Sequence, residues 1–181
     1  IEHLTVINLG ATAVGTGLNA KVEYMEAAVS YLKEITGIPV KNAENLVDAT
    51  QNTDSIAAFS GALKTFALGL SKISNDLRLM ASGPRCGLKE INLPAKQPGS
   101  SIMPGKVNPV IPEVVNQTCF QVIGNDLTIS LAVEAGQFEL NVMEPVMCFN
   151  ILQSIEILSN AVNALDTKCI QGITANADRC R

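Results

Sequence analysis

Apolar residues recur every three or four positions in four segments of the chain, which is the spacing of one face of an α-helix. The first segment runs from about Val22 to Thr36 and is followed by Gly37, a residue that ends helices. In the second segment the spacing alternates between three and four, and this 3.5-residue repeat predicts a coiled-coil-like seam. The seam residues are Ile56, Phe59, Leu63, Phe66, Leu70, Ile73, Leu77 and Met80.

The third and fourth segments run from about Pro109 to Ala135 and from about Val142 to Gln171. A helix of about 30 residues is about 45 Å long, which exceeds the diameter of a globule of this size. Its second apolar face must therefore pack against helices of other subunits or of a longer chain. The pattern predicts an all-α fold of long antiparallel helices with coiled-coil-like seams, contributing to a multi-subunit bundle. In the fourth segment the predicted seam residues are Ile155, Leu158, Val162, Leu165 and Cys169.

Three stretches lack the helical pattern. The first, Asn8 to Asn19, contains three glycines that do not follow the GxGxxG order, so it favours close backbone approach over phosphate binding. The second, Lys41 to Asn52, is predicted to be a polar connection. The third, Gly83 to Pro109, is much longer than the roughly two to eight residues that usually join helices. Connections of that length are commonly functional.

Composition narrows the function classes. The 181 residues carry 17 acidic and 13 basic side chains, and a net charge of −4 argues against a nucleic-acid binder. Hydrophobic residues make up 47% and aromatic residues only 4%, a balance that suits close-packed helices. The apolar runs are too short for a membrane span, so we expect no membrane partner. The odd number of cysteines favours reduced thiols and a cytoplasmic location. The ends of the sequence suggest an internal piece of a longer polypeptide.

Metal chemistry is not expected. The single histidine, His3, excludes a multi-histidine site within one chain, and we interpret it as an ordinary surface or interface residue. The five cysteines show no metal-ligand spacing, so they are expected to be reduced thiols, most of them buried. No metal site and no cofactor are predicted.

The string GSSIMPGKVNP at positions 99–109 gathers groups that suit an anion. Lys106 supplies a positive charge, Asn108 an amide donor, and Ser100 and Ser101 hydroxyl groups. The helix that follows presents its N-terminus here, which also favours an anion. Glu113, one turn into that helix, could pair with Lys106 or tune a proton. On these residues alone, an anion-binding loop and an ordinary solvated loop remain equally open.

This string resembles the signature of the fumarase/aspartase superfamily, homotetrameric lyases that release ammonia, water or an amine to give fumarate. The flanking segments are similar as well: DLRLMASGPRCGLKEINLP before it, NQTCFQVIGND and GQFELNVMEPV after it, and NLGATAVGTGLN near the start. The resemblance covers the whole sequence in order. It implies that residues 1–181 form part of the central helical domain, without the upstream active-site regions and the small C-terminal domain. It also implies that residues 84–109 are a flexible catalytic serine loop.

The resemblance assigns roles to individual residues. Ser100 inherits the role of general base, which removes the proton next to a substrate carboxylate and forms an aci-carboxylate intermediate. Glu113 matches a carboxylate that assists at the site. The residues implied to bind the substrate carboxylates are Ser101, Lys106, Val107 through its backbone, and Asn108.

Three functional interpretations stay open. The flanking segments resemble the aspartases, which convert L-aspartate to fumarate, more than the class II fumarases, and this preference rests on resemblance alone. The implied partners are a small dicarboxylate, L-aspartate or fumarate, and three further subunits of a homotetramer that share active sites. A catalytically silent oligomerisation bundle is the third interpretation. The 181 residues alone are expected to be inactive, because the family builds each site from three regions on different subunits.

Overall fold

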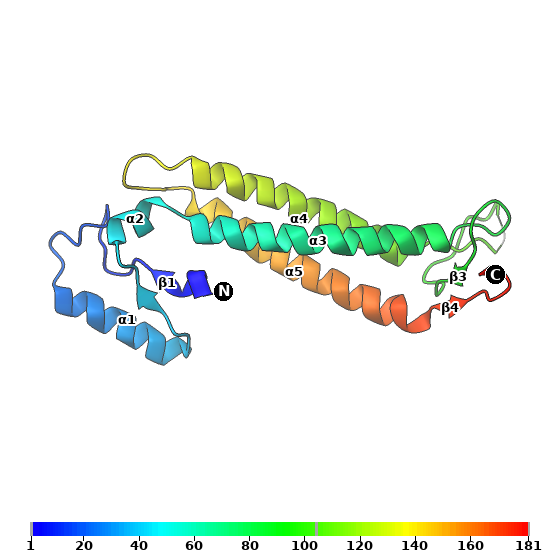
Figure 1. Cartoon of the computed structure of the whole chain (residues 1–181), viewed down its shortest axis with the longest axis horizontal. Coiled ribbons are helices and arrows are strands. Elements are labelled where there is room, and N and C mark those ends of the chain that lie inside the picture. The colour runs from blue at the N-terminus through cyan, green and yellow to red at the C-terminus, as the bar shows by residue number, and fades with distance from the viewer. Residues whose placement is uncertain (1, 104, 181) are drawn as a thin grey trace. The chain divides into compact units, whose positions relative to one another are not determined.

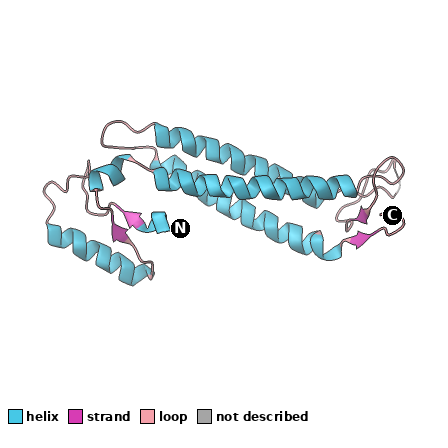
Figure 2. Cartoon of the chain, viewed as in Figure 1, coloured by secondary structure: helices cyan, strands magenta, loops and turns pink. Residues whose placement is uncertain are grey.

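The computed structural model describes residues 2–103 and 105–180, and the elements in these ranges confirm the all-α prediction (Figure 1). Figure 2 shows that helices dominate and that the strands are short. Every strand has two residues. The elements in chain order are η1 (Glu2–Thr5), β1 (Val6–Ile7), α1 (Val22–Thr36), β2 (Lys41–Asn42), α2 (Leu46–Gln51), α3 (Asp54–Met80), β3 (Ile91–Asn92), α4 (Val110–Glu134), α5 (Glu144–Lys168), η2 (Ile170–Gly172) and β4 (Thr174–Ala175).

The predicted helix boundaries agree closely with the structure, with one exception. The first helix has the predicted range, and the three long helices end within a few residues of theirs. The expectation that residues 41–52 form only a polar connection is wrong, because α2 lies there. Asn45 explains its start: its Oδ1 accepts hydrogen bonds from the backbone N–H of Val47 at 3.0 Å and of Asp48 at 3.1 Å. This is a standard N-cap arrangement that a six-residue helix needs.

The chain divides into two compact units, which we describe separately. Unit 1 contains residues 1–62 and 126–151, and unit 2 contains residues 63–125 and 152–181. Each unit holds one part of each long helix. Hydrogen bonds within the units show that α3 and α4 are antiparallel, because Ser60 pairs with Asp126 while Ser71, further along α3, pairs with the earlier residue Asn116.

In unit 1 the glycine-rich stretch packs against two helices. A Cβ added at Gly10 would lie 2.6 Å from the Cγ atom of Met25 in α1, and one added at Gly15 would clash with the backbone of Val47 in α2. Both glycines have a left-handed φ, +85° and +82°. The interpretation of this stretch as a place of close backbone approach is therefore confirmed.

Unit 2 contains a hydrophobic core, which the three long helices build together. Polar side chains join the helices within it: Asn116 donates to Ser71 Oγ at 2.9 Å, and Asn125 donates to Ser154 Oγ at 3.0 Å. Paired in this way, the buried amides do not destabilise the core. Its buried apolar residues are Ala67, Leu77, Val115, Cys119, Val122, Leu158, Ala161, Leu165 and Cys169.

The predicted seam of α3 is only partly correct. Leu63, Leu70, Leu77 and Met80 lie in or against the core, but Phe66 and Ile73 are half exposed. Small residues occupy the most buried positions of the helix, because helices approach most closely where side chains are short. These residues are Ser60, Ala67, Ser71 and Ser74.

The predicted seam of α5 is also only partly buried. Leu158, Leu165 and Cys169 are buried as predicted, whereas Ile155 and Val162 are exposed by 41% and 38%. Both helices therefore carry large apolar side chains on a face that the described residues leave uncovered.

Helix α3 is, among the described residues, the one helix long and apolar enough to cross a membrane by length and composition. The sequence analysis did not predict this. The helix buries three serines against its neighbours and carries an ion pair between Lys72 and Asp76 on its outer face. Charged pairs of this kind are rare on a helix that faces lipid.

Candidate active site

The predicted serine loop joins α3 to α4, and the C-terminal segment anchors its middle. Strand β3 pairs antiparallel with β4, with Ile91 opposite Ala175 and Asn92 opposite Thr174. The Asn92 side chain donates to Asn176 Oδ1 at 2.7 Å. The β3 part of the loop is thus held in place by the C-terminal segment.

The signature string folds back on itself. A Cβ on Gly99 would clash with the carbonyl oxygen of Lys106, so the first residue of the string lies against the backbone of its eighth and only glycine fits there. The sequence pattern suggested hinge freedom at Gly99 and Gly105. The structure assigns Gly99 a steric role instead, while Gly105 has a φ of +78° and open space around it. Pro104 lies outside the described residues.

Short hydrogen-bonded turns fix the serine end of the string. The backbone N–H of Ile102 donates to Ser100 Oγ at 3.3 Å, and that of Met103 donates to the Ser100 carbonyl at 3.2 Å. Ser100 is half-buried and Ser101 is exposed. The predicted base therefore already has a backbone donor at the oxygen that would carry negative charge.

A cavity of about 320 Å³ opens beside this loop in unit 2. It brings together three of the six predicted site residues, Lys106, Val107 and Asn108, whereas Ser100, Ser101 and Glu113 are not on its wall. No carboxylate is found among the described residues that line it. The wall also contains Arg78, Lys89 and Asn92.

Glu113 stands in the first turn of α4, half-buried, with its N–H bonded to the Pro109 carbonyl at 3.0 Å. The sequence allowed an ion pair between Glu113 and Lys106. Within the described part of the chain these two side chains form no such pair. Lys106 is exposed and remains available to a ligand.

Sequence analysis missed two cations of this cavity, Arg78 and Lys89. Arg78 belongs to the last turn of α3 and donates from Nη1 to Asn116 Oδ1 at 3.2 Å. Lys89 lies in the segment before β3 that resembles the superfamily. Hydrophobic periodicity carries no signal for either residue. Only the fold, which returns the chain to the start of α4, shows that both line the same cavity as Lys106.

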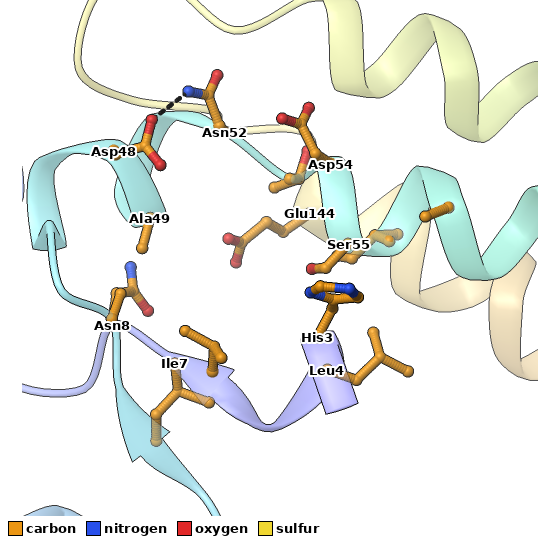
Figure 3. A pocket seen from close by; sticks show the side chains of 15 residues that line it. His3, Leu4, Ile7, Asn8, Asp48, Ala49, Asn52, Asp54, Ser55 and Glu144 are labelled. Atoms are coloured by element: carbon orange, nitrogen blue, oxygen red, sulfur yellow. Dashed lines mark hydrogen bonds between the residues drawn. The ribbon is translucent and has the colours of Figure 1, made fainter. Parts of the chain in front are cut away.

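A larger cavity, of about 620 Å³, lies in unit 1, and its wall carries the opposite charge (Figure 3). Its wall carries the carboxylates of Asp48, Asp54 and Glu144 together with His3, and no lysine or arginine among the described lining residues. In Figure 3 the Glu144 side chain extends into the middle of the space. Asn52 donates to Asp48 Oδ1 at 2.7 Å. This cavity has the wrong charge for a dicarboxylate.

No group of three histidine, cysteine, aspartate or glutamate side chains in residues 2–103 and 105–180 could hold a metal ion. Cys119 and Cys169 are buried, and burial raises the pKa of each thiol, with Lys96 opposing the shift at Cys169. Cys86, Cys148 and Cys180 are exposed, so the expectation that most cysteines are buried is wrong for this chain.

Comparison with known proteins identifies the family. A family model described as "Lyase" matches residues 1–124. The chain belongs to this lyase family. This chain is 61% identical over 180 residues to an aspartate ammonia-lyase of Bacillus subtilis (strain 168), and 58% identical over 180 residues to one of Corynebacterium glutamicum. These matches cover 99% of this chain but only 38% and 34% of the two relatives.

Solved structures agree with the family assignment. This chain matches a cobalt-bound fumarate lyase:delta crystallin from Brucella melitensis with a TM-score of 0.96 and 55% identity, over 99% of its own length and 39% of that structure's chain. It matches a class II fumarase from Schistosoma mansoni with a TM-score of 0.88 and 37% identity, over 98% of this chain and 40% of that one. The superfamily resemblance and the helical fold it implied are therefore confirmed.

Proposed function

We propose that the protein containing this chain removes ammonia from L-aspartate to give fumarate. The observation that carries the proposal is the cavity of unit 2, where Lys106 and Asn108 face a space that no described carboxylate lines. A small dianion is the ligand that such a wall favours. The 58% to 61% identity to aspartate ammonia-lyases over nearly all of this chain supports L-aspartate as that dianion.

Ser100 acts as the general base in this proposal. Its alkoxide takes the proton from the carbon next to the β-carboxylate, and the electron pair moves into that carboxylate to give an aci-carboxylate. The C–N bond then breaks as the C=C bond of fumarate forms, and ammonia leaves with the bonding pair. A serine hydroxyl is a weak base unless its anion is stabilised. The N–H of Ile102, directed at Ser100 Oγ, supplies one such donor.

The intermediate carries extra negative charge on one carboxylate, so donors fixed around that group lower the barrier. Lys106 and Asn108 are the donors on the cavity wall, and the N-terminus of α4 begins two residues later at Val110. Ser101 and the Val107 backbone complete the set that the superfamily resemblance implies. Glu113 assists from the first turn of α4.

Ser100 must approach the cavity for this chemistry, because it is not on the wall in this structure. We propose a loop movement that brings the serine end of the string over the substrate. Gly105 supports it, since its left-handed φ and open surroundings allow rotation between Ser100 and Lys106. Closure of this kind excludes water and completes a site.

A homotetramer with shared active sites is part of the proposal. Large apolar side chains are exposed along the long helices, including Phe120 at 60% and Leu127 at 62%. Within unit 2, Phe66, Ile155 and Val162 line an apolar groove of about 510 Å³. Helices of further copies would cover such faces, as bundles do. We also propose a cytoplasmic location.

The decisive experiment follows fumarate by ultraviolet absorbance with the full-length protein, offering L-aspartate and L-malate separately. Fumarate from L-aspartate alone supports the ammonia-lyase. Fumarate from L-malate alone supports a class II fumarase, the second candidate, which the 37% identity and TM-score of 0.88 to the Schistosoma mansoni enzyme favour. Fumarate from neither, in a stable oligomer, would leave the silent oligomerisation bundle.

A further inference from the structure

We infer that Asn176 is a positioning residue for the serine loop, because its side chain fastens the C-terminal segment to the first part of that loop and so fixes the point from which Ser100 moves. The inference rests on the proposed function and extends it to a residue far from the signature string. Asn176 directly follows β4, and β4 pairs with β3 inside the loop. The loop and the C-terminal segment both belong to unit 2.

Asn176 forms hydrogen bonds with three residues of the loop. Its Nδ2 donates to the Lys89 carbonyl at 2.8 Å and to Asn92 Oδ1 at 3.2 Å. Its Oδ1 accepts from Asn92 Nδ2 at 2.7 Å, and its backbone N–H donates to the Glu90 carbonyl at 2.8 Å. Removal of the side chain would take these partners from the Lys89 carbonyl and from Asn92, and would leave only the backbone bond to Glu90.

The fastened part of the loop, residues 89–94, is more buried than the residues on either side of it. Residues 89–94 are half-buried, whereas residues 83–86 and 95–99 are exposed. The close contact extends to Pro94, because a Cβ added to Gly172 would lie 2.5 Å from Pro94 Cγ. The C-terminal segment therefore holds residues 89–94 as an anchored segment inside a loop that is otherwise largely exposed.

The proposed movement of Ser100 depends on where the moving part of the loop begins. With the anchored segment in place, this part runs from residue 95 to the start of α4. Without the anchor it begins after α3, at residue 81, and is about twice as long. Doubling a flexible segment disfavours its closure about threefold. Misplacement of a catalytic group by about 1 Å adds a larger loss, so we expect an effect on rate beyond the entropy alone.

The test uses the full-length protein with Asn176→Ala and a matched control, Thr174→Ala. The control lies in the same segment and removes a weaker bond to the same partner, since Asn92 Nδ2 donates to Thr174 Oγ1 at 3.3 Å. Steady-state kinetics with L-aspartate gives kcat and KM, and thermal unfolding gives Tm. Amide hydrogen exchange is followed at Lys89 and Glu90, whose N–H groups donate to the Ser82 and Met80 carbonyls.

We expect Asn176→Ala to lower kcat about tenfold and to change KM by less than about threefold, because the substrate binds before the loop closes. Tm should fall by less than about 4 °C. Exchange at Lys89 and Glu90 should become at least about tenfold faster, while exchange in α4 stays unchanged. Thr174→Ala should remain within about twofold of wild type in kcat. If Asn176→Ala does not fold, Asn176→Asp replaces it with the same expectation, since it loses the donor to the Lys89 carbonyl.

A reversible cross-link tests the anchor directly. Asn176 bonds to the Glu90 carbonyl through its N–H, so the next pair along the strands, Ile91 and Ala175, is not hydrogen-bonded. The Cα atoms of such a pair are about 4.5 Å apart, which suits a disulfide. Ile91→Cys and Ala175→Cys are added to Asn176→Ala, and Cys180→Ser is included in both proteins because Cys180 Sγ lies 3.6 Å from the Glu90 carbonyl. Oxidation should return kcat to within about threefold of wild type, and reduction should abolish the gain.

Two results would overturn the inference. One is an Asn176→Ala protein with the kcat of the wild type. The other is a loss of kcat that the oxidised cross-link does not restore and that accompanies faster exchange throughout α4, because this would make Asn176 a residue of general stability. The proposed function fails separately: it fails if the wild-type protein releases no fumarate from L-aspartate, whereas the inference fails only in the comparison of the variants with the wild type.

Discussion

The acidic cavity of unit 1 and the cationic cavity of unit 2 differ in charge more than in any other property. The cavity of unit 1 is about twice as large and is lined by Asp48, Asp54 and Glu144. The cavity of unit 2 is lined by Arg78, Lys89 and Lys106. For the dicarboxylate that we propose as the substrate, the smaller cavity is the one that fits. Charge, and not volume, therefore identifies the candidate site.

The acidic residues of unit 1 have a structural explanation. Asp54 and Glu144 are the first residues of α3 and α5, and Asp48 lies in the first turn of α2. Negative side chains at helix N-termini stabilise the helix through its dipole. The same rule makes Lys106 unfavourable, because it precedes the N-terminus of α4 by only a few residues. An anion bound between Lys106 and this helix end would be attracted by both.

The largest expected effect follows the removal of the proposed base. Ser100→Ala in the full-length protein should lower kcat roughly a thousandfold, as loss of a general base commonly does, while fumarate still binds in the cationic cavity. The measurement is turnover of L-aspartate together with calorimetric binding. Ser101→Ala is the matched control and should act mainly on KM. A Ser100→Ala protein that keeps most of its turnover would remove Ser100 from the role.

Lys106→Ala should reduce kcat/KM about a hundredfold, with a higher KM and a lower kcat. The lysine contacts charge in both the bound substrate and the intermediate, so both constants change. Steady-state kinetics with L-aspartate gives the two constants, and high salt should weaken wild-type binding more than binding by the variant. An unchanged KM would mean that the cationic cavity is not where the dicarboxylate binds.

A glycine-to-alanine substitution made once in each unit distinguishes an effect on turnover from an effect on stability. Gly15→Ala in unit 1 adds a clash with Val47 at a left-handed φ, and should lower the free energy of unfolding by about 2–4 kcal/mol. Gly99→Ala pushes the exposed serine loop away from Lys106. It should reduce turnover tenfold or more with little change in stability. Thermal unfolding and kinetics on both variants check this, and equal loss of stability in the two would contradict it.

The sequence predicted most of the fold because helices leave a strong periodic signal. All four predicted helical segments are helices in the structure. Helix α2 was not predicted, because six residues cannot show a period and Asn45 alone marks its start. The predicted seams differ from the observed contact faces because periodicity assigns the large apolar side chains to the contact. In α3 the closest contacts are instead made by serines such as Ser60 and Ser74, whose polarity conceals their burial.

The sequence predicted only those cavity residues that lie next to one another in the signature string. Lys106, Val107 and Asn108 belong to one string, and the structure brings these three to one wall. Arg78 lies 28 positions before Lys106, and no local pattern relates them. The prediction that most cysteines are buried fails because it rests on the residue type and not on the position of each cysteine in the fold. Roles that depend on chemistry, such as those of Ser100 and Glu113, remain predictions.

The smallest effect concerns the acidic cavity. Asp54→Asn should lower the free energy of unfolding by about 0.5 kcal/mol, because Asp54 interacts with the α3 dipole from an exposed position. It should leave the KM for L-aspartate unchanged, since unit 2 provides the anion site. Urea unfolding and steady-state kinetics on the full-length protein measure both quantities. If removal of this negative charge instead lowered the KM severalfold, the acidic cavity would act on substrate binding, and the separation of the two cavities by charge would no longer describe how the protein selects its ligand.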